Sequence, residues 1–234
     1  MLDVEGLSAS YGVLQVLWDI SFKVNDKEIV SIVGPNGAGK STLVKTISGL
    51  LHPTRGRILF KGEQIERMPP HEIVKKGLTL IPEGREIFPR LTVEENLLLG
   101  AYTIQEKDTV TETMDRVCDI FPVLRKKKKI LAQTLSGGEQ QMLVICRSLM
   151  SKPDLLILDE PSLGLAPIVL EKTLDTLRKI NEDGVTILLI EQNIRESLEI
   201  ADRGYVLEEG KIVAEGEGKE LLSNNHIKEV YLGI

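Results

Sequence analysis

The sequence predicts an α/β fold, with a mostly parallel sheet, an antiparallel β layer near the N-terminus and a helical subdomain inserted at about residues 88–152. Three observations lead to this expectation. Short alternating segments fill the first sixty positions, strand patterns are missing between Leu97 and Leu155, and strand and helix patterns alternate after Leu155. We expect a single domain over residues 1–234, because a chain of this length can bury one sizeable core.

The antiparallel layer is predicted from short segments with the sequences LDVEGL, VLWDISFKV and RILF. Turn-forming residues, such as Asn25-Asp26 and the stretch 53–56, separate these segments. A further segment, residues 28–33 (EIVSIV), is apolar and leads directly into a glycine-rich loop. We therefore expect it to be a buried strand that lies beside the antiparallel layer.

The middle of the chain changes from strand to helix patterns. Leu78–Ile81 is predicted to be a strand, and Thr92 is predicted to cap a helix that begins at Val93, with Glu95 completing a capping box. Residues 109–128 are also compatible with a helix. This stretch without strands predicts the helical insertion.

The last third of the chain alternates between strand and helix patterns. We expect a helix over 167–180, a strand over 185–190, a helix over 192–200 and a hairpin of residues 205–207 and 212–214 that turns at Glu209-Gly210. Repeated strand and helix units are typical of a parallel sheet with helices on its faces.

Gly34–Thr42 (GPNGAGKST) carry the strongest functional signal. They match the pattern G-x-x-x-x-G-K-[ST] between a strand and a helix, which is the setting of a phosphate-binding loop. The glycines let backbone N–H groups point at phosphate oxygens, Lys40 would reach the β- and γ-phosphates, and the Ser41 hydroxyl would bind Mg²⁺. The expected ligands are the phosphates of a nucleotide and Mg²⁺, and the expected binding residues are Gly34, Pro35, Asn36, Gly37, Ala38, Gly39, Lys40, Ser41 and Thr42.

Two later segments also carry chemistry. In LSGGEQQ (residues 135–141), Ser136 can cap the following helix, which is either a second anion-binding helix start or simply a capped helix. In DLLILDE (residues 154–160), an apolar strand ends in two carboxylates. Asp159 is placed to complete the Mg²⁺ shell and Glu160 to orient or deprotonate a water, although a surface pair of acids is the alternative.

Composition and charge narrow the class of protein. The net charge of −6 argues against broad nucleic-acid binding, although it allows a local basic patch. The apolar runs are far shorter than the roughly twenty residues of a membrane span, and no signal peptide is evident. Cys118 and Cys146 lie in apolar, helix-like surroundings, so we expect both to be buried thiols of a reducing compartment.

Two features remain open at this level. The run Arg125–Lys129 (RKKKK) could contact nucleic acid or lipid, but a solvated helix end is favoured because no aromatic residues are interleaved with it. Tyr11, in the sequence SYG, could stack on a nucleobase, but the local pattern favours simple packing.

The P-loop, LSGGEQ and LLILDE segments together resemble the ATP-binding subunits of ABC transporters. Their order matches that family, with Ser136 lying 96 residues after Lys40 and Asp159 lying 23 residues after Ser136. Within the family, PEGREIFPRLTVEENL and DEPSLGLAP are similar to an ATPase subunit of branched-chain amino-acid importers, one that usually works beside a second, different ATPase. The resemblance covers essentially the whole chain.

This resemblance implies roles that the local patterns leave open. Tyr11 becomes the residue that stacks on adenine, and Glu160 becomes the general base. The segment from Glu83 to about Tyr102 would meet a coupling helix of the transmembrane permease. The signature residues, which would cover the γ-phosphate of an ATP held on the facing subunit, are Ser136, Gly137, Gly138, Glu139 and Gln140.

Three positions depart from the wider family's pattern. Glu83 stands where a glutamine usually contacts Mg²⁺ and water, Gln192 stands where the switch histidine is usual, and Ala166 replaces the aspartate of the inter-subunit loop. A carboxylate at position 83 adds negative charge near the phosphates, and an amide at position 192 cannot hold a proton. These departures resemble the branched-chain subgroup itself.

The sequence therefore predicts an ATP-hydrolysing subunit that powers a membrane importer from the cytoplasmic face. Its expected partners are a second ATPase subunit arranged head to tail, either another copy or a different chain, and permease subunits, with a substrate-binding protein acting indirectly and no nucleic acid. Two alternatives stay open: an importer of urea or short amides, and a soluble ABC-type ATPase that acts on ribosomes or DNA. Such soluble proteins usually carry two linked ATPase domains or a long coiled-coil insertion, and this chain has neither.

Overall fold

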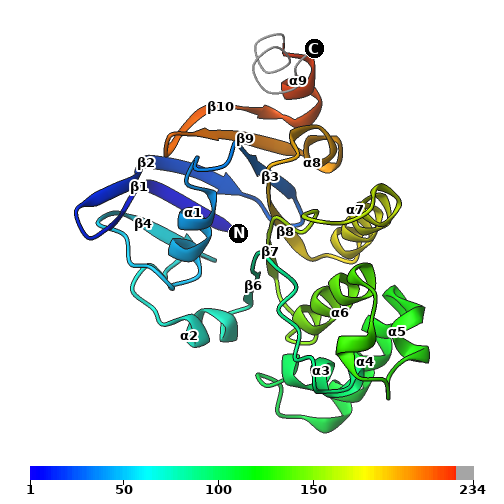
Figure 1. The fold of residues 1–234 in the computed structure, drawn as a ribbon. Coiled ribbons are helices and arrows are strands. Elements are labelled where there is room, and N and C mark those ends of the chain that lie inside the picture. The colour runs from blue at the N-terminus through cyan, green and yellow to red at the C-terminus, as the bar shows by residue number, and fades with distance from the viewer. Residues whose placement is uncertain (225–234) are drawn as a thin grey trace.

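A six-stranded sheet forms the centre of the computed structural model, which describes residues 1–224 (Figure 1). Its strand order is β10-β9-β3-β8-β7-β6, and all neighbours pair in parallel except β10 with β9. The strands are β3 (Ile29–Val33), β6 (Leu78–Ile81), β7 (Leu155–Asp159), β8 (Thr186–Glu191), β9 (Arg203–Glu208) and β10 (Lys211–Glu217). The carboxyl ends of β3, β7 and β8 meet at one edge, where parallel sheets usually bind their ligands.

A second, antiparallel sheet has the order β2-β1-β4-β5. It consists of β1 (Leu2–Tyr11), β2 (Leu14–Val24), β4 (Arg55–Phe60) and β5 (Glu63–Gln64). Together with α1 (Lys40–Ile47), it packs against one face of the central sheet in a shared apolar core, in which Phe60 is fully buried. The predicted antiparallel layer is therefore confirmed.

Helices form a second lobe, which Figure 1 shows apart from the antiparallel sheet. The lobe contains α3 (Val93–Gly100), α4 (Lys107–Ile120), α5 (Pro122–Lys126), the 3₁₀ turn η1 (Ala132–Thr134) and α6 (Gly137–Leu149). A Cβ atom added to Gly100 would lie 1.9 Å from the carbonyl oxygen of Arg147, so α3 and α6 approach each other closely. These helices lie within the expected insertion at 88–152, whose limits as a separate subdomain stay a prediction.

The remaining helices cover the central sheet and its edges. They are α2 (Pro70–Lys75), α7 (Pro167–Glu182), α8 (Ile194–Ile200) and α9 (Gly218–Ser223). Strand β7 shows why the central strands have continuous apolar sequences. Leu155 and Ile157 belong to the core shared with the antiparallel sheet, whereas Leu156 and Leu158 belong to the core shared with the helical lobe. A strand buried on both faces needs no polar positions.

Element boundaries differ from the prediction in two places. The stretch 109–128 contains two helices, because Phe121 leaves the helical conformation and Pro122 begins α5. The helix expected at 192–200 begins at Ile194, so Gln192 lies before it.

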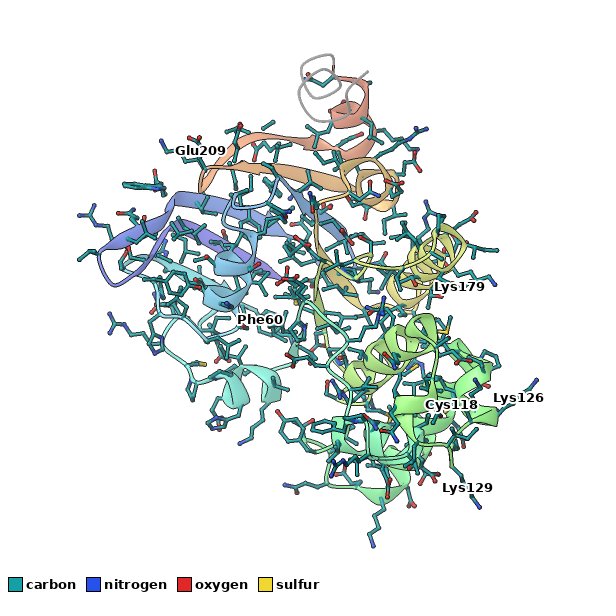
Figure 2. All side chains as sticks on the ribbon, viewed as in Figure 1. Phe60, Cys118, Lys126, Lys129, Lys179 and Glu209 are labelled. Atoms are coloured by element: carbon teal, nitrogen blue, oxygen red, sulfur yellow. The ribbon has the colours of Figure 1, made fainter. Side chains whose placement is uncertain are left out.

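Cys118 and Cys146 are both free and buried, as expected, and Figure 2 shows Cys118 within the helical lobe. Among residues 1–224, no helix combines the length and apolar character that crossing a bilayer requires.

Candidate nucleotide site

The glycine-rich loop leaves β3 and enters α1 through Gly39, which has a left-handed φ of 106°. Side chains are excluded at two of its positions. A Cβ atom added to Gly34 would lie 2.1 Å from the carbonyl oxygen of Leu207, and one added to Gly39 would lie 2.8 Å from the Leu17 side chain. The loop therefore packs against its own scaffold on one side, and a helix start such as that of α1 is the kind of structure that binds anions, so anion binding here stays a prediction.

Lys40 links this loop to the predicted general base. Its side chain is 4% exposed, and its Nζ donates hydrogen bonds to the carbonyl oxygens of Gly34, at 2.9 Å, and Pro35, at 3.2 Å. The same Nζ lies 3.1 Å from Oε1 of Glu160. Two residues that are 120 positions apart in the sequence thus form one ion pair, in which Lys40 is buried and Glu160 is partly buried.

Asp159 and Glu160 follow the apolar part of β7. Asp159 is buried, and its Oδ1 atom has no hydrogen-bond partner among the described residues. Burial, together with the negative charges of Glu160 and Glu83, raises the pKa of Asp159 to about 6. The structure therefore brings Glu83 close enough to influence Asp159. An orphaned, buried carboxylate oxygen fits a hard divalent cation such as Mg²⁺, which prefers oxygen ligands. Within residues 1–224, no three acidic, histidine or cysteine side chains gather closely enough to hold a metal ion by themselves.

The other predicted contacts lie around this centre. Ser41 and Thr42 stand in the first turn of α1, as the P-loop pattern requires. Tyr11 ends β1 with 46% of its surface exposed, so the core does not enclose its ring and a stacking face is available. Gln192 is exposed and follows β8, and its side chain forms no hydrogen bond within residues 1–224. Stacking by Tyr11 and a switch role for Gln192 stay predictions.

The signature residues form a second, separate half of a site. Ser136 caps α6, its hydroxyl accepting from the Glu139 N–H while Glu139 accepts from the Ser136 N–H, and the predicted cap is confirmed. The Gln140 side chain donates to the carbonyl oxygen of Leu135. No hydrogen bond or ion pair within residues 1–224 joins the loop 34–42 to residues 136–140. The two segments also lie in different apolar cores, α1 with the antiparallel sheet and α6 with the helical lobe.

Four features of the site lie beyond the sequence interpretation. The buried carboxylate of Glu191 accepts hydrogen bonds from the Ser162 N–H, at 3.0 Å, and hydroxyl, at 2.7 Å, and burial raises its pKa. Its position at the end of an apolar strand repeats the pattern of Asp159, which was an available signal. The Gly210 N–H donates to the carbonyl oxygen of Ala38, so the β9–β10 turn supports the P-loop.

The other two features are basic side chains that contact the signature. Lys127 donates to Glu139 at 2.6 Å, and this hydrogen bond lowers the pKa of Glu139. Arg85 lies against Gly137. The rest of the basic run matches the predicted solvated helix end, because Arg125 pairs with Asp119, at 3.0 Å, and Figure 2 shows Lys126 and Lys129 extending outward from the lobe.

Comparisons with known proteins agree with this geometry. The ABC transporter family profile matches residues 17–163. The high-affinity branched-chain amino acid transport ATP-binding protein BraG of Pseudomonas aeruginosa is 46% identical over 233 residues, covering 100% of both chains. A probable branched-chain amino acid transport ATP-binding protein, LivF, of Archaeoglobus fulgidus is 40% identical and covers 100% of this chain and 99% of its own.

Solved structures show the same fold. The ADP conformation of an ATP-binding cassette of an ABC transporter, MJ1267, aligns with a TM-score of 0.89 and 29% identity, covering 100% of this chain and 99% of its own. A nucleotide-free ATP-binding cassette from an ABC transporter aligns with a TM-score of 0.87 over 100% of this chain and 99% of its own, also at 29% identity. With its P-loop lysine paired to the glutamate after β7, this chain belongs to the ABC transporter family as one of its nucleotide-binding ATPase subunits.

Proposed function

We propose that this chain drives a membrane importer for branched-chain amino acids, from the cytoplasmic face of the membrane, by hydrolysing ATP that it shares with a second ATPase subunit. One observation supports the shared site. Lys40, Asp159 and Glu160 gather at one sheet edge, whereas Ser136 caps a helix that lies in a different apolar core from α1 and forms no hydrogen bond or ion pair with residues 34–42 among the described residues. The full-length likeness to two relatives named for branched-chain amino acid transport supports the cargo.

The described residues suggest a division of work within one site. Backbone N–H groups of residues 34–42 and the Lys40 ammonium would hold the β- and γ-phosphates, with Tyr11 against the adenine. Ser41, Asp159 and Glu83 would hold Mg²⁺, which supplies positive charge beside the phosphates when bound. Lys40 would exchange its contact with Glu160 for the phosphates, which would free the Glu160 carboxylate to take a proton from the attacking water. The Gln192 amide would donate to the γ-phosphate.

The signature half would complete the ATP site of the neighbouring subunit. Residues 136–140 present the N-terminus of α6, whose dipole and open N–H groups attract an anion. A second copy, or a second ATPase of the same fold, placed head to tail would bring its own P-loop to this surface. ATP would then join the two subunits, and hydrolysis would release them.

An apolar groove supplies the surface on which we place the permease. The groove, of about 490 Å³, lies between α2, β6, α3 and α6. Large apolar side chains that are about half exposed line it, namely Leu50, Phe88, Leu99 and Tyr102. Exposed apolar side chains gathered in one groove are typical of a protein-binding site. A cytoplasmic helix of the permease would fill it.

Two substitutions test the ATPase roles. Glu160→Gln keeps a hydrogen-bonding side chain but removes the base, so we expect retained ATP affinity and a loss of turnover of at least about a hundredfold. Lys40→Ala should weaken ATP binding itself, measured with a fluorescent ATP analogue. Substantial turnover by the Glu160→Gln chain would overturn the general-base role, and unchanged binding by the Lys40→Ala chain would overturn the cradle.

Co-purification from native membranes tests the assembly. Recovery of permease subunits and an ATPase partner supports the importer, and transport assays with leucine, urea and acetamide then decide the cargo. A variant with a charge in the groove, Leu99→Glu, should lose the permease, whereas Val213→Glu, at an exposed apolar position of β10, should keep it. Recovery of ribosomal proteins or DNA instead would favour the soluble ATPase alternative.

A further inference from the structure

The guanidinium group of Arg85 lies where three functional segments meet. Its Nη2 atom donates to the carbonyl oxygens of Gly164, at 2.8 Å, and Leu163, at 3.3 Å, in the loop that follows Glu160. A Cβ atom added to Gly137 would lie 2.7 Å from Nη1 and 3.2 Å from Cζ. The guanidinium therefore lies directly against the first residue of α6, in space that a larger side chain at position 137 would contest.

Arg85 also belongs to the segment that borders the permease groove. The Ile87 N–H donates to the carbonyl oxygen of Arg85 at 2.7 Å, so the chain turns tightly after it. Three residues after Arg85, Phe88 lines the groove, and its N–H and carbonyl are both held by the Asn96 side chain, at 2.9 and 3.0 Å. A displacement of Phe88 by a docked helix would therefore reach Arg85 through a short, hydrogen-bonded stretch.

The loop after Glu160 is held on its other side by the nucleotide half of the site. Glu191 holds Ser162, and the backbone carbonyl of Glu191 accepts from the Gly34 N–H at 3.3 Å. Residues 162–164 are thus attached through Glu191 to the first residue of the P-loop and through Arg85 to the first residue of the signature helix. This loop bridges the two half-sites of one chain.

We propose that Arg85 is a positioning residue that couples the permease groove to the signature and to the loop after Glu160. The inference rests on the proposed function and adds a route by which permease movement reaches the ATP sites. A guanidinium suits this role because it is planar, carries five N–H donors and can stack on one peptide while bonding to others. A lysine ammonium is a compact point charge that cannot cover Gly137 and bond to both carbonyls.

Hydrogen exchange measured on the intact chain tests the positioning directly. In Arg85→Gln, we expect exchange of the amides in residues 161–166 and 135–141 to rise about five- to tenfold, because the loop loses two hydrogen bonds and the helix start loses its cover. The matched control is Arg67→Gln, since Arg67 is exposed and forms no hydrogen bond or ion pair within residues 1–224. Unchanged exchange in Arg85→Gln, or an equal rise in the control, would overturn the proposal.

Kinetics separate positioning from a general loss of structure. Arg85 does not contact its own chain's P-loop, so Arg85→Gln should keep the ATP dissociation constant within about twofold while kcat falls about tenfold or more. Arg85→Lys should recover less than half of the lost kcat. Full recovery by lysine would show that charge alone suffices and would overturn the role of the planar fork.

ATP binding and hydrolysis by the unaltered chain test the proposed function, whereas hydrogen exchange and kcat of Arg85→Gln test the coupling role. If the unaltered chain neither binds nor hydrolyses ATP, the proposed function fails, while the exchange experiment still decides whether Arg85 holds the two segments. If the unaltered chain hydrolyses ATP and Arg85→Gln shows unchanged exchange and kcat, only the coupling role fails.

Discussion

Asp159, one of the predicted Mg²⁺ ligands, destabilises the folded chain when its buried carboxylate is ionised. Its pKa is raised from 3.8 to about 6 by burial and by neighbouring carboxylates, so the folded chain holds this proton more tightly than the unfolded chain. Stability from this group is therefore present at low pH and lost as the pH rises through about 4 to 6. At full ionisation the cost is at most about 3 kcal/mol.

Asp159→Asn should consequently stabilise the nucleotide-free chain about twice as much at pH 8 as at pH 5, because at pH 5 only about half of the cost is present: the unfolded chain is ionised there while folded Asp159 is still largely protonated. Thermal unfolding at the two pH values measures this difference. Asp175→Asn is the control, because Asp175 is exposed in an ion pair with Arg178 and its replacement should give no comparable gain at pH 8. A lower melting temperature of Asp159→Asn at pH 8 would contradict the cause given for the shift.

Individual residues were predictable where a local pattern defines their chemistry. Lys40 and Asp159 follow from a glycine-rich loop and from an apolar strand that ends in acids. Arg85 and Lys127 follow from no such pattern, because their partners, Gly164 and Glu139, are determined by how separate segments fold together. A long basic side chain in a loop has the same local sequence whether it is solvated or bonded.

The first prediction at the scale of elements concerns two helix caps. Thr92 begins α3 and Ser136 begins α6 with the same capping box, so replacing either by alanine should cost about 1 kcal/mol of stability. Only Ser136→Ala should also lower kcat in the isolated chain, because the signature helix presents its N–H groups to ATP. Equal effects of the two substitutions on kcat would show that Ser136 acts as a cap alone.

A second prediction at the scale of elements concerns the turn between β9 and β10. Gly210 has a φ of 75°, its N–H donates to Ala38 of the P-loop, and a Cβ atom added to it would lie 1.8 Å from the carbonyl oxygen of Val16. Gly210→Ala should therefore displace the turn and weaken ATP binding about tenfold or more. Figure 2 shows Glu209, the preceding residue, at this end of the hairpin.

Gly62 provides the matched control for Gly210. Its φ is 80°, but nothing lies within 4 Å of an added Cβ atom. Gly62→Ala should cost about 1 to 2 kcal/mol through backbone strain and leave ATP affinity unchanged. Titration of both variants with a fluorescent ATP analogue separates the two effects. Equal losses of affinity would show that the turn does not support the P-loop.

Elements with a strong period were predictable, and their junctions were less so. Leu78–Ile81 matches its predicted bounds, since a strand buried between turn residues leaves little choice. The division of 109–128 into α4 and α5 depends on how Phe121 packs into the helical core, where it is buried. The support of the P-loop by Gly210 also depends on tertiary contact, because the two segments are more than 160 positions apart.

At the scale of the whole molecule, local patterns predicted the layers, whereas the division of the site between two chains was expected only from the family resemblance. The antiparallel sheet and the helical lobe follow from the position of strand patterns along the chain. The separation of Lys40 from Ser136 follows instead from the placement of α1 in one apolar core and of α6 in another, on opposite faces of the central sheet. Periodicity alone does not assign a helix to a face.

That separation makes the strongest prediction for the assembled molecule. Lys40→Ala removes the P-loop half and leaves the signature intact, whereas Ser136→Asp removes the signature half. Aspartate is a good N-cap, so α6 should keep its start while the added charge repels the γ-phosphate. Each variant alone should be nearly inactive, because every ATP site in its dimers lacks one half.

Mixing the two variants should restore activity if two copies of this chain share their sites. Each mixed dimer would contain one site built from the intact P-loop of the Ser136→Asp chain and the intact signature of the Lys40→Ala chain. With random assortment, about half of the dimers are mixed, so the recovered ATPase activity should reach up to about a quarter of that of the unaltered chain. It should also fall steeply on dilution, since assembly depends on concentration. Activity that stays at the level of the separate variants would place the missing half on a different ATPase subunit, and full activity of either variant alone would refute the shared site.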